Sequence, residues 1–127
     1  MAPVRVVAAV IERDGKFLAC RRAPHKSLAG YWEFPGGKVE AGETDEAALT
    51  REIREELDVS IKVGDFIGTS ANVAGEVMID LVAYRSVIVD GVIVASSDHD
   101  QLMWLTPIEF SKLNWSPADL PVLELLC

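Results

Sequence analysis

Three glutamates, Glu52, Glu55 and Glu56, stand at i, i+3 and i+4 in this chain of 127 residues. If the segment is helical, the three side chains project from one side of it. Like charges at these spacings each destabilise a helix by roughly 0.3 kcal/mol, and only Arg51 and Arg54 accompany them. A divalent cation such as Mg²⁺ or Mn²⁺ would relieve the repulsion, because these ions prefer oxygen ligands. The pattern therefore indicates metal-assisted phosphate chemistry, with a solvated acidic helix face as the alternative.

A glycine-rich turn precedes these acids. Residues 31–38 read YWEFPGGK, an apolar run that ends in Pro35, Gly36 and Gly37. Pro-Gly-Gly is a strong turn signal, and glycine lets the backbone approach a ligand closely. Such a turn alone is usually only a loop. Directly before an acid-rich helix, it predicts a second wall of the same site, built from backbone carbonyl or N–H groups.

The acids need a helix to position them, and the sequence predicts one. Thr44 is a candidate N-cap, and the acids that follow it suit the positive end of the helix dipole. The helix is expected to run to about Leu57. Its apolar spacing places Ala47, Ala48, Ile53 and Leu57 toward a core.

The rest of the chain supplies the strands that carry this helix. Apolar, β-branched runs between turn signals predict strands at Val4–Glu12, Lys16–Arg22, Trp32–Phe34, Ser60–Ser70, Glu76–Val89, Val92–Ala95 and Gln101–Leu105. Asp-Gly pairs at 14–15 and 90–91 predict hairpins. Further helices are expected at Pro107–Leu113 and Pro121–Leu126, each with proline near its first turn. This mixed order of elements predicts an α/β sandwich.

The acid-rich segment carries a resemblance to a known motif. Residues 37–59 read GKVEAGETDEAALTREIREELDV, which resembles the Nudix box, G-x5-E-x7-R-E-U-x-E-E-x-G-U with U an aliphatic residue. Asp58 stands where the box has its last glycine. That position lies just past the helix, where left-handed backbone is cheap for glycine and tolerable for aspartate. We expect a modest stability cost there, with the carboxylates intact.

The resemblance continues outside the box, through residues 6–22, 29–43, 98–105 and 116–126. It is strongest to the MutT-like members that clean nucleotide pools, and above all to the bacterial CTP pyrophosphohydrolase type. The resemblance implies a Nudix-type α/β/α sandwich with a mixed central sheet, an α/β (α+β) fold that takes residues 1–127 as a single domain.

A metal site and a reaction are also implied by the resemblance. It implies Mg²⁺, with Mn²⁺ as an alternative, bound by Glu52, Glu55, Glu56 and the carbonyl of Gly36. Water would attack the β-phosphorus of a nucleoside triphosphate, releasing nucleoside monophosphate and pyrophosphate. Arg51 is expected to orient Glu43 or a metal-binding glutamate through a charge-assisted bond. A surface pair with Glu55 is the alternative for this arginine.

The family places a further acid on the loop before the strand that carries Trp104, and Asp98 matches it by position. Its side chain is one methylene shorter than the usual glutamate. Glu52 and Asp98 are both candidates for the general base, and Asp100 is a fallback. His99 is expected to be structural or solvated, because a lone loop histidine usually is.

Candidate substrate contacts come from several segments. Arg21, Arg22 and Lys38 are the cations available for the phosphates, and Gly37 lies in the turn beside them. Solvation at a strand end is the alternative for Arg22. Trp32 and Phe34 alternate, so one is expected to line a base pocket and stack on the base while the other packs in the core.

Selection of the base is assigned to Asp119. It matches the position at which oxidised-guanine enzymes of the family carry an asparagine that reads the base. A carboxylate accepts hydrogen bonds, which suits the exocyclic amine of cytosine. The N1–H and N2–H₂ edge of guanine also donates, so 8-oxo-dGTP remains the rival substrate. A helix N-cap or turn acid is the structural alternative for Asp119.

Composition limits the other possibilities. A net charge of −8 argues against a nucleic-acid polymer as partner. No apolar run approaches the roughly 20 residues that cross a bilayer, and the two cysteines lack metal-ligand spacing. We therefore expect a cytoplasmic monomer or homodimer that acts on a small nucleotide. Cleavage of nucleotide sugars or ADP-ribose is a less favoured rival, and a nucleotide-binding sensor without turnover is the alternative of another class.

Overall fold

The structure is a computed structural model that describes residues 3–127, apart from the side chain of Ala74. Its elements in chain order are β1 (Val4–Arg13), β2 (Lys16–Arg22), β3 (Trp32–Glu33), β4 (Gly36–Lys38), α1 (Asp45–Leu57), β5 (Ser60–Ala74), β6 (Val77–Asp90), β7 (His99–Leu105), the 3₁₀ helix η1 (Pro107–Lys112) and α2 (Leu120–Leu126). Within these residues no helix is long and apolar enough to cross a membrane.

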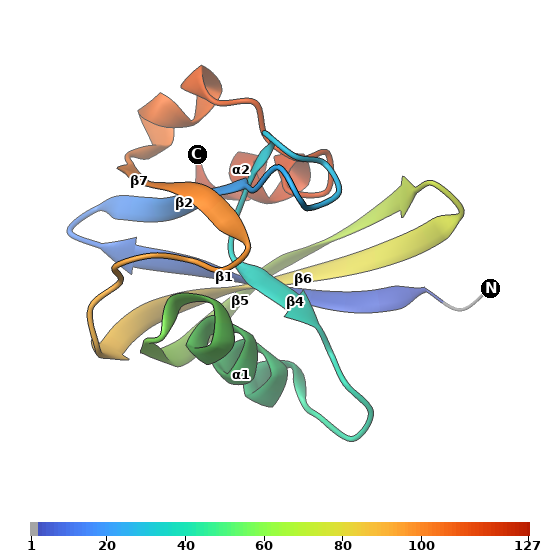
Figure 1. Ribbon diagram of the computed structural model, residues 1–127, viewed down its shortest axis with the longest axis horizontal. Coiled ribbons are helices and arrows are strands. Elements are labelled where there is room, and N and C mark those ends of the chain that lie inside the picture. Colours follow the sequence, from blue (N-terminus) through green and yellow to red (C-terminus); the bar gives the residue numbers. More distant parts are fainter. Residues whose placement is uncertain (1–2) are drawn as a thin grey trace.

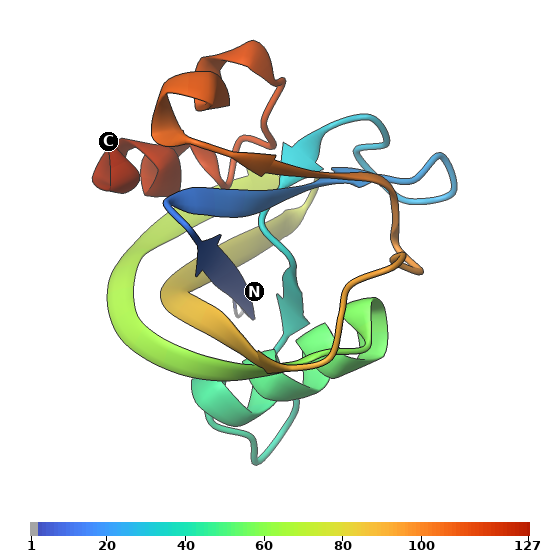
Figure 2. The same ribbon diagram turned by 90° about the vertical axis from the view of Figure 1, so that its left-hand side faces the viewer.

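The strands of the described chain form one mixed sheet in the order β3-β2-β1-β6-β5, with β4 paired to β1 and β7 paired to β2. The β1–β6 pair is parallel, and the other pairs are antiparallel. Helix α1 lies on one side of the strands, while η1 and α2 lie on the other (Figures 1 and 2). The predicted α/β/α sandwich with a mixed sheet is therefore confirmed.

Two apolar clusters fill the two sides of the sheet. Successive side chains of a strand point to opposite faces, and β1 follows this rule: Val7, Ala9 and Ile11 belong to the cluster under α1. Ala8 and Val10 belong to the cluster under η1 and α2. The central strand β1 is thus buried on both faces and forms a rigid base for the elements around the acids.

The edge of β1 is shared by two partners. Near its end it pairs with β2, at Glu12↔Phe17 and Arg13↔Lys16. Nearer its start it pairs with β4, at Val7↔Gly37 and Ala8↔Gly36. The glycine turn is therefore a short strand laid along β1, which the sequence prediction of a loop missed because glycine offers no alternating pattern.

Helix α1 confirms the predicted helix and its cap. The backbone N–H of Ala47 donates to Thr44 Oγ1 at 3.1 Å, and Ala48, Ile53 and Leu57 are buried as expected. The prediction for Ala47 was wrong, since this residue is exposed and Leu49 is buried instead. The buried face of the helix therefore includes Leu49, the residue after Ala48, and not Ala47, the residue before it.

The predicted strand at 92–95 is absent. Residues 91–98 run as an irregular crossing from the end of β6, near α1, to the start of β7 (Figure 2). Strand β6 is flanked by β1 and β5, and β5 pairs up to the contact of Ser60 with Asp90. The chain does not return alongside β6 but crosses to β2, which it joins as β7.

Asp58 closes α1 in the left-handed conformation predicted for it, at φ 55° and ψ 38°, and its N–H donates to the carbonyl of Arg54. We expect Asp58→Gly to raise the free energy of unfolding by about 0.5–1 kcal/mol, because glycine adopts this conformation without a Cβ penalty. Urea unfolding checks this value. Asp58→Ala is the matched control and should lower stability, since alanine cannot bond locally to compensate.

Candidate active site

Glu56 is the most perturbed acid of the predicted set. It projects from α1 into the interior and is only 7% exposed. Burial, together with the nearby charges of Asp98, Glu52 and Glu33, raises its pKa to about 9. Within residues 3–127 its Oε2 atom has no hydrogen-bond partner. A buried carboxylate oxygen without a partner is costly, and a bound cation would satisfy it.

The structure brings Asp98 to the same place. Asp98 and Glu56 are close enough for a side-chain hydrogen bond to be among the causes that raise the pKa of Glu56. Asp98 also contributes to the raised pKa of Glu52, which is caused first by burial. On its other side, the Asp98 carboxylate lies 3.6 Å from Lys26 Nζ. The acid that the resemblance placed before Trp104 thus joins the acids of α1.

Glu33 is a member of this acid group that sequence reasoning missed. It lies on β3 between two buried aromatics, Trp32 and Phe34. The signal was available, because alternation along the segment turns a charged residue away from the face that its aromatic neighbours share. Glu33 contacts Arg22 and His99, and its charge raises the pKa of both Glu56 and Asp119.

Arg51 connects the loop to the helix acids. Its Nε and Nη2 bond the two carboxylate oxygens of Glu43 at 2.8 and 2.9 Å, and its Nη1 donates to Glu52 Oε1 at 2.9 Å. The same Nη1 reaches Glu55 Oε2 at 3.3 Å, and Nη2 reaches the carbonyl of Lys38 at 3.1 Å. The Arg51 bonds to Glu43, together with the backbone N–H of Glu40, lower the pKa of Glu43 to about 2. Arg51 therefore contacts both of the partners expected for an orienting role, as well as Glu55.

Gly36 and Gly37 are each required to be glycine, for different steric reasons. A Cβ on Gly36 would lie 1.9 Å from the carbonyl oxygen of Val7, so only glycine permits β4 to run against β1. A Cβ on Gly37 would lie 2.3–2.6 Å from the carboxylate atoms of Glu52. Gly37 therefore leaves the space that the Glu52 carboxylate occupies, and the turn forms one wall of the acid site.

The acids fit a hard divalent cation by their chemistry. They supply oxygen donors, and the unpartnered Oε2 of Glu56 is an open ligand. Within the described chain no three Asp, Glu, His or Cys side chains already converge as a metal site. Glu52 and Glu55 both accept from Arg51, and Glu55 is 60% exposed. The three glutamates thus share one helix side, with Glu55 turned away to solvent.

The predicted phosphate-binding cations are partly engaged elsewhere. Arg22 makes a two-point contact with Glu33, at 3.0 and 3.1 Å, and also bonds Ser27. Arg21 pairs with Asp100 at the surface, at 2.7 and 3.1 Å, so the fallback base is itself held in an ion pair. Lys38 is exposed and makes no ion pair with the residues that the structure describes.

The residues predicted to read the base lie in the interior. Phe34 and Trp32 are 3% and 6% exposed and both belong to the cluster under η1 and α2, where Phe34 packs against Trp115 with ring centroids 5.0 Å apart. Neither ring presents an open face. Asp119 is 5% exposed, and its Oδ2 accepts from the backbone N–H of Phe34 at 2.7 Å. Asp119 stands at the N-cap position of α2 without a capping bond from its side chain.

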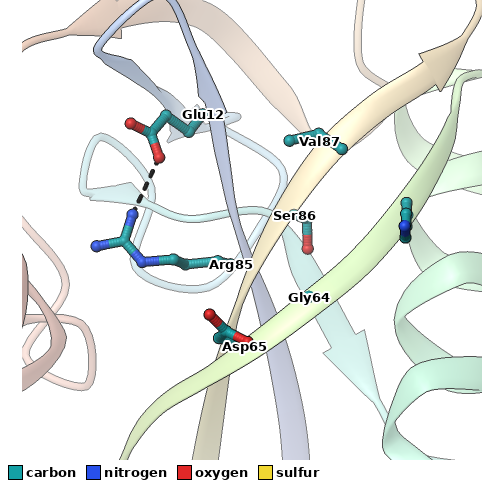
Figure 3. Close-up of a pocket in the computed structure, with 7 residues that line it drawn as sticks. Glu12, Gly64, Asp65, Arg85, Ser86 and Val87 are labelled. Atoms are coloured by element: carbon teal, nitrogen blue, oxygen red, sulfur yellow. Dashed lines mark hydrogen bonds and ion pairs between the residues drawn. The ribbon is translucent and has the colours of Figure 1, made fainter.

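One surface hollow lies away from the acid site. A hollow of about 310 Å³ lies over β5 and β6, lined by Glu12, Lys62, Gly64, Asp65, Arg85, Ser86 and Val87 (Figure 3). Arg85 spans it to Glu12 at 3.0 Å, and none of the acids around Glu56 contributes to its lining. The buried, charged and unpaired groups around Glu56 indicate the functional site more strongly than surface shape does, because groups with perturbed pKa values cluster at such sites.

The raised pKa of Asp119 makes the stability of the fold depend on pH. Burial, together with the charge of Glu33, raises this pKa to about 8. Between its ordinary pKa of 3.8 and about 8, the unfolded chain ionises while the folded chain keeps the proton. Stability should therefore fall as pH rises through this range. Asp119→Asn keeps an acceptor for Phe34 N–H, so its denaturant midpoint should change less between pH 5 and pH 8 than that of the wild type. An equal change in both proteins would contradict the assignment.

Comparison with known proteins agrees with this fold. A family model described as the NUDIX domain matches residues 1–126. The chain therefore belongs to the Nudix family and is a Nudix hydrolase, as its box predicted.

Similar proteins cover nearly the whole chain. It is 40% identical to the CTP pyrophosphohydrolase of Escherichia coli, over 98% of this chain and 91% of that protein. It is 43% identical to the putative 8-oxo-dGTP diphosphatase 2 of Mycobacterium tuberculosis, over 90% of this chain and 81% of that protein. Among solved structures, a MutT NUDIX hydrolase from Burkholderia pseudomallei superposes with a TM-score of 0.90 at 26% identity, over 100% of both chains.

Proposed function

We propose that this protein is a metal-dependent nucleoside triphosphate pyrophosphohydrolase that releases a nucleoside monophosphate and pyrophosphate. We further propose CTP, dCTP or 5-modified cytidine triphosphates as its substrates, acted on in the cytoplasm by residues 1–127 as one catalytic domain, in a monomer or a homodimer. The observation that carries the activity is the acid group of Glu56, Glu52 and Asp98, in which the buried Glu56 has an oxygen without a hydrogen-bond partner among residues 3–127.

The metal would be Mg²⁺ or Mn²⁺, held by Glu52, Glu55, Glu56 and the carbonyl of Gly36. When bound, such an ion neutralises phosphate oxygens and positions them for attack. Lys38 is exposed on the same turn and offers a free ammonium to the phosphates. Gly37 admits the Glu52 carboxylate, and Arg51 fixes that carboxylate at 2.9 Å. Glu52 or Asp98 then orients the attacking water and accepts its proton.

Burial changes what Asp119 offers to a base. With its pKa at about 8, the side chain keeps its proton at neutral pH. One oxygen then accepts while the other carries an O–H donor. That pair matches the edge of cytosine, which presents the N4 amine as donor and N3 as acceptor. An ionised Asp119 would match the N1–H and N2–H₂ donors of guanine instead. The protonated form therefore supports the cytidine assignment better than the acceptor-only carboxylate that the sequence suggests.

Access to Asp119 requires movement of the chain that covers it, because the residue is 5% exposed and Phe34 packs over the same region. Phe34 contributes in this view by holding Asp119 through its backbone N–H. Stacking of the base on the Phe34 ring needs the same movement. The similarity to the Mycobacterium tuberculosis protein keeps 8-oxo-dGTP as the second candidate substrate.

The experiment compares kcat/KM for CTP, dCTP, 5-methyl-dCTP, dGTP, 8-oxo-dGTP and ADP-ribose at pH 6.5 and pH 9. We expect a cytidine substrate to be preferred, and the ratio of CTP to 8-oxo-dGTP to fall at the higher pH as Asp119 ionises. The ratio cancels titrations of the acid site, which affect both substrates. In Asp119→Asn the ratio should stay constant with pH. Preference for 8-oxo-dGTP at both pH values would overturn the cytidine assignment.

A further inference from the structure

The segment that delivers Asp98 to the acid site is irregular. Residues 91–98 form neither strand nor helix, and Val92 and Val94 are 79% and 88% exposed. Regular backbone hydrogen bonds do not hold such a crossing, so its path has to be fixed by individual contacts. Asp98 nevertheless lies beside Glu56 at the end of this segment.

A line of hydrogen bonds runs from Asp98 into the interior. The backbone N–H of Asp98 donates to Ser96 Oγ at 3.3 Å, and Ser96 Oγ lies 2.7 Å from His99 Nδ1. His99 Nε2 lies 2.9 Å from Glu33 Oε2. Because a carboxylate only accepts, Nε2 carries a ring proton, and in the neutral ring Nδ1 then accepts from the serine hydroxyl. Each donor in the line then has one acceptor, and the side chain of His99 is fully buried.

The far end of this line is fixed to the sheet. Glu33 lies on β3, opposite Cys20 of β2, and Arg22 holds its carboxylate at two points, 3.0 and 3.1 Å away. The carbonyl of Asp98 accepts from the backbone N–H of Ala23 at 3.0 Å. Asp98 is thus tied on both sides of its Cα, once through the serine and histidine and once directly to the end of β2.

We propose that Ser96 and His99 are positioning residues, which hold Asp98 in the acid site by connecting its backbone to Glu33. This inference rests on the proposed function, in which Asp98 acts on the attacking water or a metal. A buried histidine with both ring nitrogens bonded defines a single orientation, and the serine between it and Asp98 transfers that orientation to the loop. Neither residue touches substrate in this account.

The alternative is that His99 and Ser96 only contribute to folding. The two accounts differ in a double-mutant cycle. If Ser96 and His99 act through Asp98, the variant Asp98→Asn has already lost their contribution to kcat. A double variant should then be no slower than Asp98→Asn alone. If they act only on the fold, the losses in kcat multiply.

The test measures kcat and KM for Ser96→Ala and His99→Gln, alone and combined with Asp98→Asn. His99→Gln keeps a donor toward Glu33 and loses the acceptor for Ser96. We expect each single variant to lose roughly 10–100-fold in kcat with KM within about 2-fold, and no further loss on top of Asp98→Asn. Ser97→Ala is the matched control on the same segment, exposed in the structure, and should remain active. Multiplying losses, or equal activity of Ser96→Ala and Ser97→Ala, would overturn the proposal.

A second readout does not depend on turnover. Amide hydrogen exchange of the peptide covering residues 91–100 should quicken by roughly 10-fold or more in Ser96→Ala, and stay at the wild-type rate in Ser97→Ala. Unchanged exchange in Ser96→Ala would overturn the connection itself. If the wild type hydrolyses no nucleotide, the proposed function fails while the exchange experiment still decides whether Ser96 and His99 hold Asp98.

Discussion

Glu56→Gln is expected to lower turnover by about 10³-fold or more and, at the same time, to make the metal-free protein more stable. Activity falls because the amide cannot serve as an anionic ligand to the metal. The structural basis is the position of Glu56, which is 7% exposed beside Asp98, Glu52 and Glu33. We expect few other substitutions that keep the size of the side chain to lower activity and raise stability by so much.

The gain in stability follows from the raised pKa. The pKa of Glu56 is about 9 in the folded protein against an ordinary 4.5. Below pH 4.5 both states are protonated and the shift has no cost. Above it the unfolded chain ionises while the folded chain retains its proton, so stability falls until about pH 9. At pH 7 the difference amounts to about 3 kcal/mol, most of which the neutral glutamine avoids.

Urea unfolding in the presence of a chelator, at pH 5 and pH 8, measures this effect. The stability gap between Glu56→Gln and the wild type should be wider at pH 8. Glu46→Gln is the matched control, because Glu46 is exposed on the same helix. It should change neither activity nor the pH dependence. A Glu56→Gln protein that is less stable than the wild type, or that still turns over substrate, would contradict the assignment of this residue.

The second large effect separates the adjacent glycines. Gly36→Ala is expected to destabilise the fold by roughly 3 kcal/mol or more, because its Cβ would lie 1.9 Å from the carbonyl oxygen of Val7 and 2.9 Å from the Cα of Ala8. Both atoms belong to the backbone of β1, which is buried on both faces and cannot yield. Thermal unfolding measures the loss.

Gly37→Ala should behave differently. Its Cβ would meet the Glu52 carboxylate at 2.3–2.6 Å, which is the far end of a flexible side chain. The fold can accommodate this by displacing the carboxylate, so we expect a stability change below about 1 kcal/mol and a loss of roughly 10²-fold in kcat. The opposite ranking, with Gly37→Ala unfolded and Gly36→Ala folded and active, would show that the turn is packed differently.

The sequence predicted those parts of the fold that neighbouring residues determine, namely the ends of α1 and the first hairpin. Thr44 caps α1 as expected, and Asp58 ends it in the left-handed conformation. The Asp14-Gly15 hairpin joins β1 and β2 as predicted. The strand at 36–38 was missed because its two glycines form it through backbone contact with β1, for which a sequence has no side-chain signature.

The connections of the site depend on tertiary structure instead. His99 and Glu33 are separated by 66 residues and meet only because β7 and β3 both pair with β2. Asp119 meets the backbone of Phe34 across 85 residues, and its burial, which sets its protonation, cannot be read from a turn sequence. The sequence therefore indicated the acids of α1 and Asp98, whereas the pairing of strands brings Glu33 to them.

The most direct test of the central claim is the product analysis of CTP incubated with the wild-type protein and Mg²⁺. We expect CMP and pyrophosphate in equal amounts, and no CDP. Release of CDP with inorganic phosphate would contradict the proposed cleavage, and binding of CTP without turnover would make the protein a nucleotide sensor rather than a hydrolase of this type.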